Sequence, residues 1–299
     1  MTPGMEWTDR RVLLTGAAGG IGGCLARQLA AAGARLALAD RDAGGLQRLR
    51  EELRDAGGPR GAAHVALPTD LSDPEQACAL VARAEAALGG VDVLINNAGL
   101  LSFRPLEDER PEDTARLFAV NVVAPVLLSR SVLPGFRRRG AGRIVNIGSI
   151  FGSIGFAWFA SYSASKFALR GFSEALRREL AGTGIGVTYV APRATRTPLA
   201  ATFGRMAAAV KMNLDEPESV ARRILRAVER DGKDRYLGFP ECVFVRLNAL
   251  LPRLIDRAVA RQDALAEPFA RESSALPRPT GAPPTIATTS SEPEPSCTP

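Results

Sequence analysis

The stretch Val12–Gly22 has the sequence VLLTGAAGGIG and decides the fold. A short apolar run ends at Thr15, and a glycine-rich turn then leads into the segment Gly22–Ala32, which has helical length. Glycines in such a turn let the backbone approach a pyrophosphate, which then sits where the free N–H groups of the helix point. Taken alone, the turn could also be a plain connector between a strand and a helix.

The rest of the chain repeats this pattern of a short apolar run followed by an amphipathic segment. The apolar runs are Val12–Gly16, Leu36–Asp40, His64–Asp70, Val91–Gly99, Arg143–Ser149 and Gly186–Pro192. The segments of helical length are Gly22–Ala32, Ala43–Ala56, Pro74–Leu88, Pro111–Arg138 and Tyr162–Leu180. Continuous apolar strands that alternate with helices indicate a parallel sheet covered on both faces. The fold class is therefore α/β, a single doubly wound Rossmann-type domain.

Length and composition divide the 299 residues into three parts. Residues 1–240 hold the alternating pattern and are predicted to form one Rossmann-fold catalytic domain. Residues 241–267 are predicted to form an amphipathic helical extension, which Pro252 should kink. Residues 268–299 contain eight prolines and ten serines or threonines. Such a segment cannot bury enough apolar surface to offset its ordering entropy, so we expect a disordered tail.

The cysteines and the histidine limit the chemistry. The four cysteines form no CxxC pair, and His64 is the one histidine. A disulfide framework, a metal site of His and Cys ligands, and a histidine general base are therefore not expected. Proton transfer, where the protein needs it, must use another side chain.

The net charge of +6 predicts little about partners, because the basic residues are dispersed through helical segments. Arg137–Arg139 is the one compact basic run, and no aromatic residues interleave with it, so we expect no nucleic-acid partner. The first residues lack an apolar signal core, and no apolar stretch reaches the ~18 residues of a membrane helix. A cytoplasmic protein is expected.

Asp40 ends the second apolar run and bears on cofactor choice. A carboxylate there can accept hydrogen bonds from the adenosine ribose hydroxyls and would repel a 2′-phosphate, which favours NAD over NADP. Arg41 could bind that phosphate, so NADP remains possible. Alternatively, Asp40 opens a turn.

Five motifs together resemble the short-chain dehydrogenase/reductase family over about residues 8–240. The turn matches TGxxxGxG, and because Gly19 is also a glycine it equally matches the pattern of the longer subclass that includes sugar epimerases. The other motifs are NNAG at Asn96–Gly99, Asn121, Ser149, and YSASK at Tyr162–Lys166. In NNAG and Asn121 the sequence resembles the short subclass of the family rather than the epimerase-like one. Less favoured alternatives are a non-catalytic cofactor-binding sensor on this fold and an epimerase or dehydratase.

The resemblance implies a nicotinamide cofactor and a set of residues that bind it. They are Thr15, Gly16, Gly20, Ile21, Gly22, Asp40, Arg41, Asp70, Leu71, Asn97, Ala98, Gly99, Tyr162, Lys166, Pro192, Thr195 and Thr197. The segment after the sixth strand departs from the family's PGxxxT, because Arg193 replaces the glycine. Arg193 could contact the substrate or a cofactor phosphate, or face solvent.

Tyr162 and Lys166 are predicted to work as a pair, because residues four apart share one helix face. A phenol has a pKa of ~10, and a neighbouring ammonium together with an oxidised nicotinamide would lower it. The resemblance implies that Tyr162 is the general acid/base and that Ser149 binds the substrate oxygen. It also implies that Lys166 holds the ribose, while Asn121 positions a water that relays protons. A surface Tyr/Lys pair is the alternative.

The substrate side of the sequence is apolar. In the family, the loop after Ser149 borders the substrate pocket, and here it carries Phe151, Phe156, Trp158 and Phe159. A variable lid is expected over Leu199–Leu214, with Phe203, Met206, Val210 and Met212. These residues favour a hydrophobic carbonyl or secondary-alcohol substrate of ketoacyl, steroid-like or aromatic type. Packing into the core or a subunit interface is the alternative.

Two expectations concern assembly. The resemblance implies a homodimer or homotetramer. The apolar face of Cys242–Leu265 could cover the pocket, join a second subunit or lie on a membrane. Its charges balance, so attraction to anionic lipid should be weak and peripheral membrane contact is the least favoured.

Overall fold

The computed structural model describes residues 5–55 and 64–275, and within them seven parallel strands form one sheet. The strands are β1 (Arg11–Thr15), β2 (Arg35–Asp40), β3 (Val65–Pro68), β4 (Val93–Asn96), β5 (Gly142–Ile147), β6 (Ile185–Pro192) and β7 (Asp234–Leu237). Their order across the sheet is β3-β2-β1-β4-β5-β6-β7. The doubly wound α/β fold is confirmed, and the chain reverses direction across the sheet between β1 and β4.

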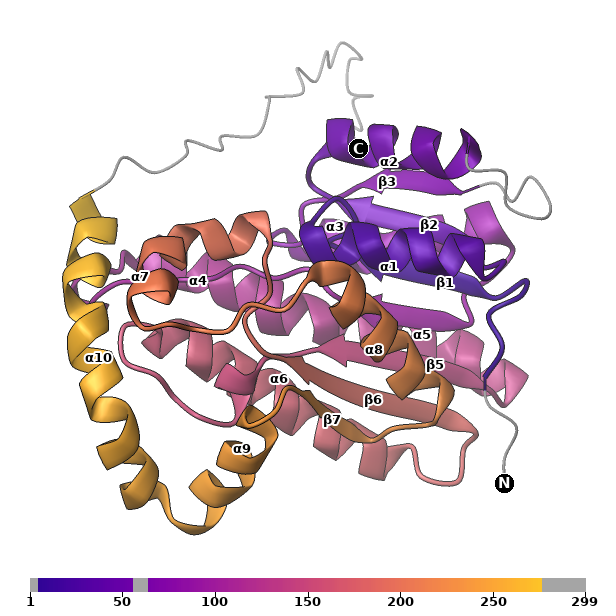
Figure 1. Ribbon diagram of the computed structural model, residues 1–299. Coiled ribbons are helices and arrows are strands. Elements are labelled where there is room, and N and C mark those ends of the chain that lie inside the picture. Colours follow the sequence, from indigo (N-terminus) through magenta and orange to yellow (C-terminus); the bar gives the residue numbers. More distant parts are fainter. Residues whose placement is uncertain (1–4, 56–63, 276–299) are drawn as a thin grey trace, which may run out of the picture.

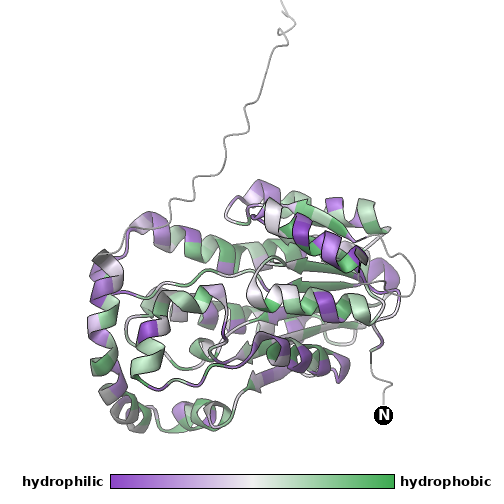
Figure 2. Cartoon of the chain, turned by 45° about the horizontal axis from the view of Figure 1, so that its top comes forward, coloured by the Kyte–Doolittle hydropathy of each residue, from purple (hydrophilic) through white to green (hydrophobic). Residues whose placement is uncertain are grey.

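Helices cover both faces of this sheet (Figure 1). One layer contains α1 (Gly20–Ala31), α2 (Ala43–Asp55) and α8 (Pro217–Glu229), and the other contains α3 (Pro74–Leu88), α5 (Ala124–Arg139) and α6 (Ala160–Glu179). Each layer has its own apolar core, centred on Leu25 and Ile224 on one side and on Leu80 and Leu128 on the other. The strands are apolar along most of their length (Figure 2), as expected for strands buried on both faces.

The segment predicted as one helix over Pro111–Arg138 is interrupted. It consists of α4 (Pro111–Phe118), one π-helical turn at Ala119–Val123, and α5. Single π turns inside α-helices are frequent at functional sites. This turn contains Asn121.

By length and composition, the stretch Pro111–Arg139 is apolar enough to cross a membrane, contrary to the expectation that no apolar stretch is long enough. In its most apolar window, 44% of the residues are buried. Leu128, Val132 and Phe136 pack beneath the sheet. The stretch therefore occupies the position of a core helix.

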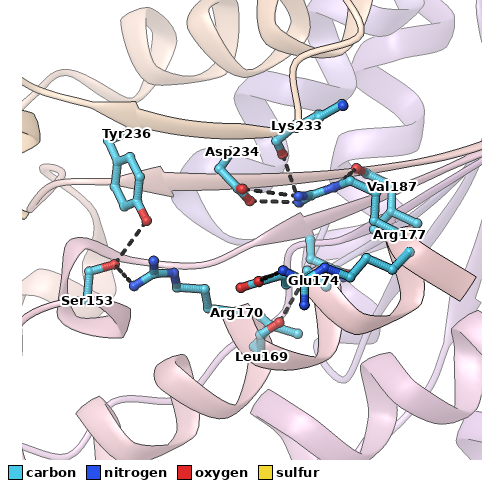
Figure 3. A network of polar contacts seen from close by, with 12 residues as sticks. Ser153, Leu169, Arg170, Glu174, Arg177, Val187, Lys233, Asp234 and Tyr236 are labelled. Atoms are coloured by element: carbon cyan, nitrogen blue, oxygen red, sulfur yellow. Dashed lines mark hydrogen bonds and ion pairs between the residues drawn. The ribbon is translucent and has the colours of Figure 1, made fainter. Parts of the chain in front are cut away.

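The sequence did not predict β7 or α8. Arg177 of α6 holds β7 in place, since its guanidinium pairs with Asp234 at 2.7 Å and donates to the Lys233 carbonyl at 3.2 Å. The same side chain donates to the Val187 carbonyl of β6 at 3.1 Å (Figure 3). A four-residue edge strand carries too short an apolar pattern to be recognised without these tertiary contacts.

The C-terminal extension differs from its prediction at two points. Pro252 does not kink one helix but begins a second one, so α9 (Glu241–Leu250) is separate from α10 (Pro252–Ala275). The helix α10 also continues past residue 267, with Pro268 inside it, because Phe269 and Ala270 pack in one cluster with Met206. The remainder of the predicted tail, residues 276–299, lies outside the described residues.

The expected lid over Leu199–Leu214 contains a 3₁₀ segment at Pro198–Phe203 and α7 (Gly204–Ala209). The helix α10 lies alongside α7 at the edge of the molecule (Figure 1). Phe203 and Met206 point into the body, with 8% and 2% of their surfaces exposed. The lid and the extension therefore close the same end of the domain.

Candidate active site

The glycine-rich turn lies at the carboxyl ends of β1 and β4, which are adjacent in the sheet. Gly16 has a φ of 65°, and a Cβ there would lie 2.7 Å from the Ala98 Cα. A Cβ on Gly22 would lie 1.9 Å from the Gly16 carbonyl oxygen. Only glycine fits both positions, because the turn packs directly against α1 and the segment after β4. In open α/β sheets, ligands bind at this point of reversal.

Thr15 and Asn97 clamp the turn to the segment after β4. The Thr15 hydroxyl accepts hydrogen bonds from the backbone N–H groups of Asn97 at 3.0 Å and Ala98 at 3.1 Å. The Asn97 amide donates in return to the Thr15 and Gly16 carbonyls, both at 3.0 Å. Thr15 is 1% exposed and does not line the cavity, so it positions the turn rather than contacting a cofactor as predicted.

A cavity of about 220 Å³ runs along the turn and gathers most of the predicted cofactor residues. Its lining includes Gly16, Gly20, Ile21, Gly22, Asp40, Arg41, Asp70, Leu71, Asn97, Ala98, Gly99 and Thr197. An adjoining cavity of about 130 Å³ is lined by Ser149, Tyr162, Lys166, Pro192 and Thr195. Ile21, Asn97, Gly99 and Thr197 line both cavities, so the two form one cleft.

The cleft fits a dinucleotide. The helix α1 begins at Gly20, and the residue before it, Gly19, has no side chain to cap the first N–H groups. A Cβ on Gly20 would lie 2.6 Å from the Thr197 Cγ2, so a side chain there would fill the cradle beneath a pyrophosphate. The partial positive charge of the α1 N-terminus favours an anion at this position.

Two carboxylates stand at the far end of the cleft. Asp40 accepts hydrogen bonds from the backbone N–H groups of Ala18 and Asp42, both at 3.1 Å, so it both organises the turn and lines the cavity. Asp70 accepts from Ser72. Burial opposes ionisation of Asp70, but the Ser72 hydrogen bonds and the charge of Arg116 outweigh it and lower the pKa of this carboxyl.

Arg116 is a cavity residue that the sequence analysis missed. Its Nη2 lies 3.4 Å from the Asp70 carboxylate, and its side chain lines the cavity beside Leu71. Nothing in the local sequence distinguishes this arginine from other basic residues on exposed helix faces. Its role depends on the contact between α4 and the segment after β3, which only the tertiary structure fixes.

Tyr162 and Lys166 lie one turn apart on α6 and are buried, with 9% and 5% of their surfaces exposed. Ser149 and Tyr162 line the same cavity, and the Ser149 side chain acts on the Tyr162 hydroxyl to lower its pKa. Ser149 caps the 3₁₀ turn Ile150–Gly152, where its hydroxyl accepts from the Phe151 N–H at 3.2 Å. The Lys166 ammonium donates to the Ile147 carbonyl at 3.2 Å. A surface Tyr/Lys pair is excluded.

Burial shifts both groups toward their neutral forms. It raises the pKa of Tyr162 to about 12, against the opposing effect of the Ser149 hydrogen bond. It lowers the pKa of Lys166 to about 8. The predicted lowering of the tyrosine pKa needs the ammonium and a bound oxidised nicotinamide together, and it stays a prediction. In the protein alone burial has the largest effect on Tyr162, and the ammonium lies 5.8 Å from the centre of the tyrosine ring.

Asn121 lies in the π-helical turn and is fully buried. Its amide donates to the Leu100 carbonyl at 2.9 Å and the Ser165 hydroxyl at 3.0 Å, and its oxygen accepts from the Leu100 N–H at 2.8 Å. A Cβ on Gly99 would lie 3.4 Å from both the Asn121 Oδ1 and the Lys166 Nζ. Asn121 thus joins the segment after β4 to α6 close to Lys166.

Arg193 is mostly buried and lines the cavity that contains Tyr162. Its Nη2 pairs with the Asp215 carboxylate at 2.6 Å, and the side chains are 19% and 14% exposed. Arg223 lies 3.4 Å from the same carboxylate. The Thr195 hydroxyl donates to the Arg193 carbonyl at 3.0 Å. The arginine that replaces the family's glycine therefore fixes the segment after β6 through a buried ion pair.

Aromatic rings enclose the substrate side of Tyr162. Phe159 stacks on Phe103 at 4.7 Å between ring centres and meets the edge of Phe203 at 5.8 Å. The Phe151 ring meets the Tyr162 ring edge-on at 5.8 Å. These rings pack with one another, as the alternative interpretation predicted, and Phe151 and Phe203 also line the cavity. Phe103 is an addition that the sequence analysis missed.

Comparison with known proteins agrees with this geometry. The family model described as "short chain dehydrogenase" matches residues 10–208. The chain is 35% identical over 222 residues to the ketoacyl reductase HetN of Nostoc sp., covering 74% of this chain and 76% of that protein.

Solved structures give the same result. A short-chain dehydrogenase/reductase from Burkholderia phymatum in complex with NAD superposes with a TM-score of 0.77 at 28% identity, covering 84% of this chain and 96% of that one. A short-chain dehydrogenase from Sphingobium yanoikuyae in complex with NADPH gives 0.72 at 31% identity, covering 83% and 95%. This chain belongs to the short-chain dehydrogenase/reductase family of oxidoreductases.

Proposed function

We propose that this enzyme transfers a hydride between a nicotinamide cofactor, preferentially NAD, and the carbonyl or secondary alcohol of an apolar small molecule. One observation carries the proposal. Tyr162 shares a cavity with Ser149 and lies one helical turn from a buried lysine, and this cavity adjoins the glycine-lined cleft.

The cleft residues would hold the cofactor in an extended form. The turn at Gly16–Gly22 and the N-terminus of α1 would bind the pyrophosphate, while Asp70 and Leu71 would hold the adenine. Lys166 would bind the nicotinamide ribose, and the segment Pro192–Thr197 would hold the carboxamide. When bound, the nicotinamide supplies or accepts the hydride. The Sphingobium and Burkholderia structures contain NADPH and NAD, which supports this class of cofactor.

Tyr162 is the proposed general acid for reduction. Its hydroxyl would donate a proton to the carbonyl oxygen as the carbonyl carbon receives the hydride, and the phenolate would then regain a proton from solvent. Ser149 would donate a hydrogen bond to the same oxygen and stabilise its developing charge. The Lys166 ammonium favours the phenolate, which the raised pKa of the buried tyrosine otherwise disfavours. Oxidation of an alcohol reverses these steps, and Asn121 would position the water that relays the proton.

Asp40 supports the preference for NAD. Its carboxylate lines the cavity at the end of β2, where the adenosine ribose would lie, and would repel a 2′-phosphate. Arg41 lines the same end and is the residue that would accommodate NADPH. The preference for NAD or NADP therefore depends on which of the two side chains dominates the electrostatic potential at the adenosine ribose.

Two further expectations about the whole molecule remain proposals. Val123 and Phe167, on helices that the family resemblance implicates in subunit contacts, are 43% and 42% exposed, which supports a homodimer or homotetramer. Light scattering on the purified protein tests this assembly. A cytoplasmic location rests on the sequence alone.

The substrate class follows from the lining of the cavity. Phe151, Leu101 and Phe203 present apolar surface next to Tyr162, and the relative HetN is named a ketoacyl reductase. A ketoacyl or comparable apolar ketone is therefore proposed over a steroid-like or aromatic one.

The test is oxidation of NADH or NADPH by the purified enzyme across aliphatic, aromatic and acyl-thioester ketones. Replacing Tyr162→Phe removes the proton donor while keeping the ring, and we expect turnover to fall by about 10²-fold or more. Tyr236→Phe is a matched control, because this hydroxyl contacts Ser153 outside the catalytic cavity. Full turnover by Tyr162→Phe would show that the proposed mechanism is wrong.

A further inference from the structure

A third cavity, of about 300 Å³, lies between the loop after β5, the segment after α7 and the C-terminal extension. We call it the tail chamber. Its lining is Ile150, Phe151, Ile154, Phe156, Arg193, Ala194, Val210, Lys211, Met212, Asn213, Pro240, Phe244, Ile255, Val259 and Gln262. The helices α9 and α10 supply Phe244, Ile255 and Val259, so the tail chamber exists only because the extension folds back over the domain.

The tail chamber adjoins the catalytic cavity. Phe151, Arg193 and Ala194 line both. The Phe151 ring meets Tyr162 edge-on at 5.8 Å and stacks on Phe156 at 4.5 Å. One ring therefore borders the proposed proton donor on one side and the tail chamber on the other.

We propose that the tail chamber binds the unbranched aliphatic chain of the substrate, while the carbonyl of that substrate lies at Tyr162 and Ser149. This assignment rests on the proposed function and adds to it a site, a chemical class and a selection by chain length. The Phe151 side chain separates the catalytic cavity from the tail chamber, and the aliphatic chain of the substrate must pass it.

The lining favours an aliphatic chain over a polar substituent. Ile150, Ile154 and Ile255 are almost fully buried, with 3%, 4% and 3% of their surfaces exposed. The charge of Arg193 is compensated by Asp215 on its far side. The polar side chains of Lys211, Asn213 and Gln262 are exposed and stand at the rim. A volume of about 300 Å³ is at the lower end of the range for small-molecule sites.

The walls of the tail chamber are tied together by hydrogen bonds that link the extension to the loop after β5. The Trp158 Nε1 donates to the Asp263 carbonyl of α10 at 3.0 Å. The Asn248 amide of α9 donates to the Ser153 carbonyl at 3.1 Å. Because its walls are already ordered, this pocket binds an aliphatic chain without the entropy cost of ordering them.

The experiment measures kcat/KM for methyl ketones from butanone to decanone with saturating NADH. Each methylene moved from water into an apolar site contributes about 0.8 kcal/mol, so kcat/KM should rise about fourfold per methylene until the chamber is full. Val259→Trp fills the chamber from α10 and should lower the ratio of decanone to butanone activity at least tenfold. Ala260→Trp, at an exposed neighbour on the same helix, should leave that ratio unchanged.

A binding measurement separates this proposal from the proposed function. Decanone should raise the melting temperature of the wild type and of Ala260→Trp, but not that of Val259→Trp. If no ketone is reduced and this binding pattern still holds, the proposed function fails and the tail chamber stands. A wild type with equal kcat/KM for butanone and decanone, or a melting temperature that decanone does not raise, overturns the tail chamber. Met212→Trp, from the opposite wall, replaces Val259→Trp if that variant does not fold.

Discussion

The Lys166 ammonium lies 5.8 Å from the centre of the Tyr162 ring, and burial drives the two pKa values apart, to about 8 for the lysine and about 12 for the tyrosine. Both shifts favour neutral side chains, so at pH 7 the folded protein bears a cost for burying the charged lysine at this place. Groups held at such a cost in a cavity are candidates for chemistry rather than for stability.

Replacing Lys166→Met should stabilise the cofactor-free protein at pH 7 while abolishing turnover. The lysine pKa is about 8 in the folded state and 10.5 when unfolded, so burying the charged form costs about 3 kcal/mol below pH 8. We expect a gain of about 2–3 kcal/mol in the free energy of unfolding, measured by urea titration.

The pH dependence gives this prediction its control. The unfolded wild type binds more protons than the folded wild type between pH 8 and 10.5, so its stability rises across that window. The advantage of Lys166→Met should therefore shrink as the pH rises through the same window. An advantage that stays constant from pH 7 to 10.5 would mean that the buried charge is not its source.

Replacing Gly22→Ala should cost both stability and cofactor binding. The added Cβ would lie 1.9 Å from the Gly16 carbonyl oxygen, so the turn must move away from α1. We expect a loss of about 2–3 kcal/mol in the free energy of unfolding and no NADH binding by fluorescence titration. Gly171→Ala is the matched control, because nothing lies within 4 Å of its Cβ on α6, and it should stabilise by about 0.5–1 kcal/mol.

Replacing Asp40→Ser should change the cofactor preference. Removing the carboxylate takes away the repulsion of a 2′-phosphate, so the ratio of kcat/KM for NADH to that for NADPH should fall about tenfold, or about 1.4 kcal/mol. The ratio cancels any general damage from losing the hydrogen bonds to Ala18 and Asp42. Asp42→Ser, at the exposed neighbouring carboxylate, should leave the ratio unchanged. An unchanged ratio in Asp40→Ser would assign the preference to Arg41.

Replacing Arg193→Ala should destabilise the protein although Arg193 stands where the family has a glycine. Among the residues that the structure describes, it leaves the Asp215 carboxylate, 14% exposed, with the more distant Arg223. We expect a loss of about 2–3 kcal/mol in thermal or urea unfolding. Arg178→Ala breaks an exposed pair with Glu174 and should change stability by less than about 0.5 kcal/mol. Equal effects of the two variants would contradict a buried ion pair.

The proposed catalytic residues could be predicted because they lie in short sequence motifs. A glycine turn between a strand and a helix, and a tyrosine four residues before a lysine, are patterns whose spacing follows from backbone geometry. Strands β1 to β6 could be predicted from a local pattern as well, since each is a mainly apolar run between turn residues.

Other features could not be predicted, because they depend on contacts between distant segments. The strand β7 is held by Arg177, and α10 continues to Ala275 because Phe269 packs near Met206. Thr15 proved to be a clamp rather than a contact, since its hydroxyl is used by Asn97 and Ala98.

The sequence alone determined the fold class, the family and the identity of the proposed acid/base pair, because periodicity and motif spacing act over a few residues. The tertiary structure decided what surrounds that pair. It buried Tyr162 and Lys166 deeply enough to shift both pKa values, paired Arg193 with Asp215, and brought α9 and α10 across the catalytic end to form the tail chamber. Burial and ion pairing depend on which distant segments meet, and no local pattern encodes that.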